Sequence, residues 1–262
     1  HDCTIEEIQE YEPHLEQGTV VYAGVDYEAI LSEAEREADV IVWDGGNNDT
    51  PFYLPDIFIT LVDPHRPGHE VAYFPGETNL LLADVVIIGK EDTARPENIT
   101  LVKEHVRQLN EKAVIVDATL PITTERPELI QGKRALVIED GPTLTHGGMA
   151  YGAGMLAAKK FGAQEIVDPR PYAVGSIAVT LKQYTHIGKI LPAMGYGLSQ
   201  VEELRETIYR TPCDVVIIGT PIDLRKIIPL DKPSSRVRYS LCEISTPTLK
   251  EILKNKLLHL LR

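Results

Sequence analysis

Cysteine is scarce in this sequence of 262 residues: there are three, Cys3, Cys213 and Cys242, far apart and without a CxxC pair. An odd number of scattered cysteines argues against both a disulfide framework and a zinc cluster. Long apolar runs are missing too, since none approaches the roughly 20 residues that a membrane-spanning helix needs. No basic-then-apolar leader opens the chain. We therefore expect a cytoplasmic protein that does not associate with a membrane.

Positive charge is also in short supply. Lysine and arginine number 26 against 39 aspartates and glutamates, which leaves a formal net charge of -13. Nucleic-acid binding by a broad basic surface requires many phosphates to be neutralised, so we expect no nucleic-acid partner. A small anionic ligand would instead need a local pocket of cations. The composition is otherwise that of an ordinary globular protein.

Two further absences concern the start of the chain and its motifs. The sequence opens at His1 without a methionine, and it contains no GxxxxGK[ST] phosphate loop. The three Gly-Lys pairs are followed by Glu91, Arg134 and Ile190. We interpret the chain as truncated at its N-terminus.

Short apolar runs alternate with amphipathic stretches along the whole chain. This alternation predicts an α/β fold with a mostly parallel sheet and helices on both faces. The expected strands are Val40–Trp43, Ile57–Val62, Val85–Ile88, Val114–Val116, Ala135–Ile138, Glu165–Val167, Val215–Ile218 and Val237–Leu241. The expected helices are Tyr27–Glu37, Pro96–Asn110, Met149–Phe161, Leu198–Arg210 and Thr248–Leu261.

The chain has no low-complexity linker, which favours a single domain over residues 1–262. Leu120–Gln131 is the one stretch where a boundary is an alternative to a surface loop. The hexapeptide Asp-Val-Val-Ile-Ile-Gly occurs twice, at Asp84–Gly89 and Asp214–Gly219. Two buried parallel strands draw on the same few residue types, so the echo has a structural interpretation as well as a functional one.

Polar motifs follow two of the expected strands near the start. Asp44 follows Val40–Trp43 and precedes a Gly-Gly-Asn-Asn-Asp tail, a pattern typical of an aspartate that holds Mg²⁺, with a turn or cap residue as the alternative. The next motif, Asp63-Pro-His-Arg-Pro-Gly-His, offers Arg66 for phosphate and His65 and His69 for phosphate or proton transfer. Its alternative is a loop tied by an Asp63–Arg66 ion pair.

Two later motifs also suit anions. The turn Gly141–Gly154 contains Thr145, His146, Gly147 and Gly148, and it precedes a predicted helix whose free amides can bind an anion. Close packing of helix on sheet explains its glycines equally well.

Arg170 lies between two prolines, so it is preorganised for phosphate. An ion pair with Asp168 is the alternative.

Taken together, these motifs resemble those of the archaeal cyclic 2,3-diphosphoglycerate synthetases. The segments that carry the resemblance are HDCTIEE, WDGGNND, DPHRPGHE, YFPGETN, GPTLTHGGMAYGAG, AAKKFGA, DPRPYAVGS, LPAMGYG and VVIIGTPIDL. The resemblance implies a P-loop NTPase-like homodimer that uses ATP and Mg²⁺ to close 2,3-bisphosphoglycerate into a ring. It also implies an upstream P-loop segment, without which the chain alone is expected to be inactive.

The motifs and the resemblance together assign the candidate site residues. The expected catalytic residues are Asp44, Arg66, His146 and Arg170, and the expected metal ligands are Asp44 and Asp63. Nucleotide contacts are expected from Lys90, Asp92, Thr220 and Asp223, and polyanion contacts from His65, His69, Thr145, Gly147, Gly148 and Lys159. Gly89-Lys90-Glu91-Asp92 departs from the family's Asn-Lys-x-Asp, which puts guanine preference in doubt.

Two other functions compete with a synthetase. A nucleotide-hydrolysing switch or chaperone would use the same nucleotide motifs, but it would not need the Thr145–Arg170 region for a second polyanion. A noncatalytic dinucleotide binder is disfavoured because no GxGxxG follows a strand with an acidic residue about 20 positions later.

Overall fold

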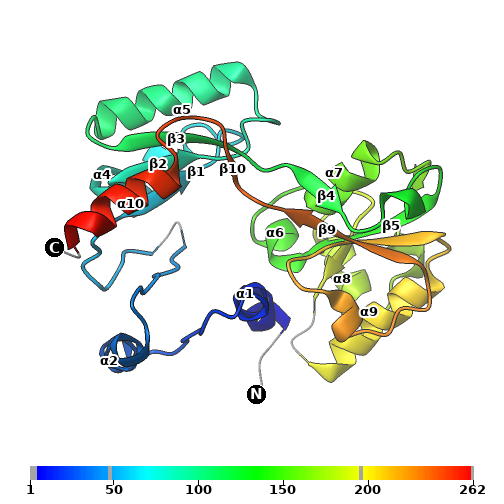
Figure 1. The fold of residues 1–262 in the computed structure, drawn as a ribbon. Helices are drawn as coiled ribbons and strands as arrows, with labels where there is room; N and C mark the ends of the chain where they lie inside the picture. Colours follow the sequence, from blue (N-terminus) through cyan, green and yellow to red (C-terminus); the bar gives the residue numbers. More distant parts are fainter. Residues whose placement is uncertain (1–4, 47–48, 195–196, 261–262) are drawn as a thin grey trace. The chain divides into compact units, whose positions relative to one another are not determined.

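The chain folds into two compact units, each with its own sheet (Figure 1). The computed structural model describes residues 5–46, 49–194 and 197–260. The first unit comprises His1–Val21 and Ile122–Tyr239, and the second comprises Tyr22–Pro121 and Ser240–Arg262. One boundary therefore falls within Leu120–Gln131. Whether the two units associate as one domain over residues 1–262 is a separate question, and that single domain stays a prediction.

The second unit is built on a four-stranded sheet in the order β1-β2-β3-β10. Strands β1 (Ile59–Val62), β2 (Val85–Ile88) and β3 (Val114–Thr119) are parallel, and β10 (Cys242–Glu243) is antiparallel to β3. The helices are α2 (Tyr27–Glu37), α3 (His69–Ala72), α4 (Gly76–Leu82), α5 (Pro96–Leu109) and α10 (Leu249–Leu260).

Helices cover both faces of this sheet, as the sequence predicts. Side chains alternate across a strand, so Val86 and Ile88 pack in one apolar cluster with residues of α4 and α5. Val85 and Ile87 face the other way and pack with Ile252 of α10. All four residues of β2 are buried, which explains why the strand is apolar throughout.

The first unit holds a larger sheet in the order β4-β9-β8-β5-β6, with β7 also paired to β5. Among the described pairings of this sheet, β4–β9 is antiparallel and the others are parallel. The strands are β4 (Ile122–Thr124), β5 (Arg134–Asp140), β6 (Glu165–Ile166), β7 (Leu191–Ala193), β8 (Val215–Gly219) and β9 (Ser234–Tyr239). The helices are α1 (Ile5–Glu16), α6 (Gly141–Thr145), α7 (Ala153–Lys160), α8 (Gly175–Gln183) and α9 (Leu198–Arg210). Short 3-10 turns lie at Pro127–Leu129, Arg170–Tyr172 and Leu224–Lys226.

The repeated hexapeptide has a structural role. Its two copies form the buried strands β2 and β8, one in each unit. The aspartate that opens each copy accepts a backbone N–H at the start of the neighbouring strand: Asp84 from Phe58, just before β1, at 2.9 Å, and Asp214 from Arg134, the first residue of β5, at 2.9 Å. In both units, therefore, the aspartate of the repeat connects its own strand to the neighbouring strand by a hydrogen bond.

Two predicted strands need correction. Val40–Trp43 is not a strand but an extended segment without regular structure, and Val42 is 84% exposed. Trp43 instead packs against Tyr27, Phe52 and Tyr53, so local aromatic contacts hold this stretch.

The strand expected at Val237–Leu241 lies at Ser234–Tyr239, because Ser234, Ser235 and Arg236 are buried in the sheet despite their polarity.

The helix expected at Met149–Phe161 begins only at Ala153. The residues before it form a turn in which Gly148 has a φ of +62°, a left-handed conformation that ends regular helix.

Candidate functional site

Most of the candidate residues follow parallel strands in the two units, at the edge where ligands bind in open α/β sheets. Asp44 lies on an irregular segment, and Lys159 lies in the last turn of α7. Asp44, Asp63, His65, Arg66, His69, Lys90 and Asp92 belong to the second unit. Thr145, His146, Gly147, Gly148, Lys159, Arg170, Thr220 and Asp223 belong to the first. Their convergence on one site stays a prediction, and each edge is described by itself.

In the second unit, Asp63 follows β1 and is the centre of a charge cluster. Its Oδ2 accepts from Lys90 Nζ at 2.7 Å and from Arg66 at 3.2 Å, while its Oδ1 accepts the backbone N–H of His65 at 3.0 Å. Burial alone would raise the pKa of Asp63, but these donors and charges hold that pKa below its ordinary value of 3.8. The Asp63–Arg66 ion pair expected as the alternative to phosphate binding is therefore present.

This cluster predicts a pH-dependent contribution to stability. The pKa of Asp63 is depressed by folding, so its stabilisation is complete above about pH 4 and is lost as the pH falls through the folded value. At pH 7 we expect Asp63→Asn to lower the free energy of unfolding by about 1 kcal/mol. Guanidinium unfolding at several pH values measures this, and the gap to the parent should close in acid. Exposed Asp56→Asn is the control, and an equal loss in both variants at pH 7 would contradict the prediction.

The histidines of this motif have partners within the unit. His65 Nε2 lies 2.9 Å from Thr93 Oγ1, and the His69 ring meets the edge of Tyr73. The nearby Glu70 is buried, and it lies 2.5 Å from His105 Nδ1.

Asp44 and Asp63, the residues expected to hold Mg²⁺, do not form a magnesium site. Asp44 is exposed on the irregular segment after Trp43, and Asp63 is already neutralised by two cations. Within the described ranges, no group of three or more His, Cys, Asp or Glu could hold a metal ion. Asn47 and Asn48 of the Asp44 motif lie outside the described residues. Mg²⁺ needs several oxygen ligands, so the arrangement of Asp44 and Asp63 does not fit it.

Two more carboxylates of the second unit, those of Glu91 and Asp117, share one lysine. Lys103 Nζ lies 2.9 Å from Asp117 and 3.5 Å from Glu91. Burial, and then the charge of Asp117, raise the pKa of Glu91. Asp92, expected at a nucleotide base, accepts the backbone N–H of Leu120 at 3.3 Å. Lys103 thus offsets only part of the negative charge of this edge.

In the first unit, the carboxyl end of β5 carries a buried glutamate that the motifs did not single out. Glu139 is 2% exposed, and its Oε1 accepts the backbone N–H groups of Gly152 at 3.0 Å and Met155 at 2.8 Å. Burial raises its pKa to about 7, although the backbone donors oppose the shift.

Three glycines make room for this carboxyl group. A Cβ on Gly219 would lie 2.5 Å from Glu139 Oε2, one on Gly152 would lie 2.7 Å from the same atom, and one on Gly154 would lie 3.2 Å from Oε1. Gly152 and Gly154 of the predicted anion turn are therefore needed for close packing against an acid.

The rest of that turn is organised by Asp140, the next residue along. Its carboxylate accepts from the backbone N–H of Thr143 at 3.0 Å and from the Thr143 hydroxyl at 2.6 Å, which caps α6. Thr145 donates to the carbonyl of Gly141 at 3.0 Å and lies 3.3 Å from His146 Nδ1.

Arg170 and Lys159, which are expected to meet phosphates in this unit, have protein partners, and so does the neighbouring Lys160. Arg170 binds Asp168 at 3.2 Å and also donates to the carbonyl of Ile187. Lys159 lies over the Tyr151 ring, and Lys160 donates to the carbonyl of Ile122 at 2.8 Å.

The two residues expected at the nucleotide here are also engaged. Thr220 donates to the carbonyl of Ile222 at 2.8 Å, and Asp223 accepts from Arg225 at 2.7 Å. Burial would raise the pKa of Asp223, but the Arg225 hydrogen bonds and charge hold it below its ordinary value.

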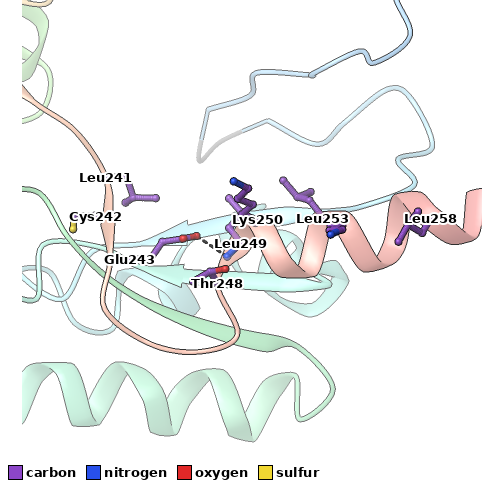
Figure 2. A pocket seen from close by; sticks show the side chains of 9 residues that line it. Leu241, Cys242, Glu243, Thr248, Leu249, Lys250, Leu253 and Leu258 are labelled. Atoms are coloured by element: carbon purple, nitrogen blue, oxygen red, sulfur yellow. Dashed lines mark hydrogen bonds between the residues drawn. The ribbon is translucent and has the colours of Figure 1, made fainter.

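One open hollow lies in the second unit, beside α10. It measures about 910 Å³ and is mostly apolar, and Figure 2 shows Leu249, Leu253 and Leu258 along the helix. None of the predicted site residues lines it. A smaller hollow of about 500 Å³ in the first unit is lined by Lys159 and Tyr151 among others.

Comparison with known proteins connects this chain to a named synthetase. The chain is similar to "Arginine synthetase ArcE" of the archaeon Thermococcus kodakarensis. The two are 63% identical over 254 residues, or 97% of this chain. The match spans 57% of that relative's length. No family model matches the sequence.

The comparison agrees with the sequence analysis at a coarse level only. An archaeal protein named as a synthetase is expected from the motifs, but the name of the relative gives arginine rather than cyclic 2,3-diphosphoglycerate. In the part of the chain that the structure describes, no helix is long and apolar enough to cross a membrane.

Glu139 is a buried strand-end acid that sequence reasoning missed. The expected strand stopped at Ile138 and the predicted anion turn began at Gly141, so Glu139 belonged to neither. The signal that could have found it was Glu-Asp-Gly directly after an apolar strand, followed by glycines at 152 and 154.

Proposed function

We propose that this chain is part of an ATP-dependent synthetase of the ligase type, and that its product is arginine. The observation that carries the proposal is the 63% identity over 97% of the chain to a protein named arginine synthetase. ATP is the expected energy source for a ligase-type reaction.

The local charges favour this product over a doubly phosphorylated one. Arg66 is bound to Asp63, Arg170 to Asp168, and Lys160 to a backbone carbonyl. A polyanion that binds Arg66 or Arg170 would have to compete with these carboxylate partners. Arginine and its precursors need fewer cations and more carboxylates, which suits a chain with a net charge of -13.

Cyclic 2,3-diphosphoglycerate synthesis is the second candidate, and the motif resemblance favours it. The segments around Arg66 and Arg170 are those expected to meet its phosphates. Under either candidate, a P-loop NTPase-like fold, Mg²⁺, a homodimer and a cytoplasmic location remain proposals. The residues that the structure describes supply no magnesium site, so no step is assigned to the metal.

The reverse reaction tests arginine as the product and requires no assumption about its precursors. The natural protein is incubated with arginine and either ADP and phosphate or AMP and pyrophosphate, and ATP is measured by luciferase. Because catalysis is reversible, a synthetase should form ATP only when arginine is present. Agmatine and lysine are the matched controls.

A parallel incubation of the natural protein with ATP, Mg²⁺ and 2,3-bisphosphoglycerate, followed by phosphorus NMR, tests the second candidate. A cyclic anhydride signal without arginine-dependent ATP would replace arginine by cyclic 2,3-diphosphoglycerate as the product. Nucleotide hydrolysis that neither substrate affects would favour the switch or chaperone.

A further inference from the structure

Glu139 is an acid without a counter-ion among the described residues. Its side chain is among the most buried polar groups of that part of the chain, at 2% exposure, and the neighbouring charge that raises its pKa is that of another acid, Asp140. No lysine, arginine or histidine in the described ranges forms an ion pair with it. A buried carboxylate in this situation either takes up a proton or receives a cation from a ligand.

The surroundings of Glu139 are backbone rather than side chain. Oε1 is held by the N–H groups at the start of α7, while the space around Oε2 is bounded by Gly152 and Gly219. Two titratable groups face it: Asp140 on β5, and Tyr239 on β9, whose pKa is raised by burial and by these two acids. The carboxyl group is therefore held in one position at the edge where parallel strands end.

Helix capping alone does not require an acid here. A glutamine could accept the same two N–H groups through its amide oxygen. An acid is needed only if its charge or its proton is used. The raised pKa, about 7, places proton uptake and release within reach of neutral pH.

We propose that Glu139 is the proton acceptor for the nitrogen nucleophile in the bond-forming step of the synthetase. The inference rests on the proposed function, because arginine synthesis closes a carbon–nitrogen bond. A nitrogen that arrives as an ammonium cation gives one proton to the Glu139 carboxylate. Its lone pair then attacks the carbon whose oxygen ATP has activated by phosphoryl or adenylyl transfer. The carbon–nitrogen bond forms, the carbon–oxygen bond breaks, and phosphate or AMP leaves with the bonding electrons.

The test uses Glu139→Gln in the natural protein and follows arginine-dependent ATP formation. In this direction Glu139 must start protonated, so the parent rate should fall as the pH rises through about 7. We expect Glu139→Gln to be at least about 100-fold slower at pH 7 and to lose this pH dependence. Arginine should still bind, with a Kd within about threefold of the parent, as measured by calorimetry.

Each outcome bears on the proposal separately from the proposed function. A parent that forms no arginine-dependent ATP defeats the proposed function. An active parent with a Glu139→Gln variant within about threefold of its rate defeats only the role of Glu139, which then caps α7. If Glu139→Gln does not fold, Glu139→Asp supplies the test. It keeps the acid and should retain the pH dependence at a reduced rate, and loss of that dependence would overturn the proposal.

Discussion

Gly219→Ala should destabilise the first unit by about 3 kcal/mol. The new Cβ would lie 2.5 Å from Glu139 Oε2, 2.8 Å from the backbone nitrogen of Gly154 and 2.9 Å from its Cα. Two of these three atoms belong to the backbone, so no side-chain rotation relieves the contact. Because Glu139 also holds the start of α7, the strain should spread to that helix. Guanidinium unfolding followed by far-UV circular dichroism measures the effect.

The repeated hexapeptide provides the control. Gly89 ends one copy as Gly219 ends the other, but a Cβ on Gly89 would meet only Leu120 Cδ1, at 4.0 Å. Gly89→Ala should therefore change stability by no more than about 0.5 kcal/mol. Similar losses in the two variants would show that position in the repeat, and not the packing of Glu139, decides the outcome.

Asn110→Ala should destabilise the second unit by a comparable amount, about 3 kcal/mol. The buried Asn110 side chain donates to the carbonyls of Leu80 at 3.0 Å and Ala83 at 2.8 Å, and it accepts the N–H of Ala113 at 3.1 Å. It thus joins the end of α5 to the end of α4. Alanine would remove all of these bonds, although the carbonyl of Leu80 also accepts the N–H of Ala83, at 3.4 Å.

The fluorescence of Trp43, the single tryptophan, reports on this unit during guanidinium unfolding. Asn110→Asp separates the contributions, because it keeps the acceptor for Ala113 and loses both donors. Gln108→Ala, at an exposed position of the same helix, should be within about 0.5 kcal/mol of the parent. A loss below about 1 kcal/mol for Asn110→Ala would contradict the assigned bonds.

Sequence patterns predicted the elements whose burial matches their polarity. The helices at Tyr27–Glu37 and Leu198–Arg210 are found with the expected bounds, and the apolar run Val85–Ile88 is the expected strand. In these elements local preference and tertiary packing agree.

The wrong predictions occur where local preference and tertiary packing disagree. Val40–Trp43 has the composition of a strand but pairs with no strand of the described residues, so its apolar side chains are exposed or packed on aromatic rings. Ser234–Arg236 has the composition of a loop but is buried in β9. The short helices α4, α6 and α8 were not predicted, since their few turns give too little periodicity to distinguish from a loop.

Two of the strand ends that carry candidate residues were predictable from the sequence, but the contacts there were not. The motifs located the strand ends that carry Asp63 and the turn after β5, because apolar runs followed by polar residues mark such edges. Which partner each charge takes depends on residues far away in sequence: Asp63 meets Lys90, and Glu139 meets Met155. Spacing along the chain holds no information about these distances, so the ion pairs and the buried acid required a structure.

The order in which segments contribute to the two units has a consequence for biosynthesis. The second unit begins at Tyr22, but its strand β10 and its helix α10 come from Ser240–Arg262, after the whole of the first unit's sheet. While the ribosome is still making the first unit, the face of β2 that carries Val85 and Ile87 has not yet received Ile252. A nascent chain therefore presents this apolar face to chaperones until the α10 segment has left the ribosome. Stop codons after residue 239 should yield insoluble product even though every residue of the first unit is present.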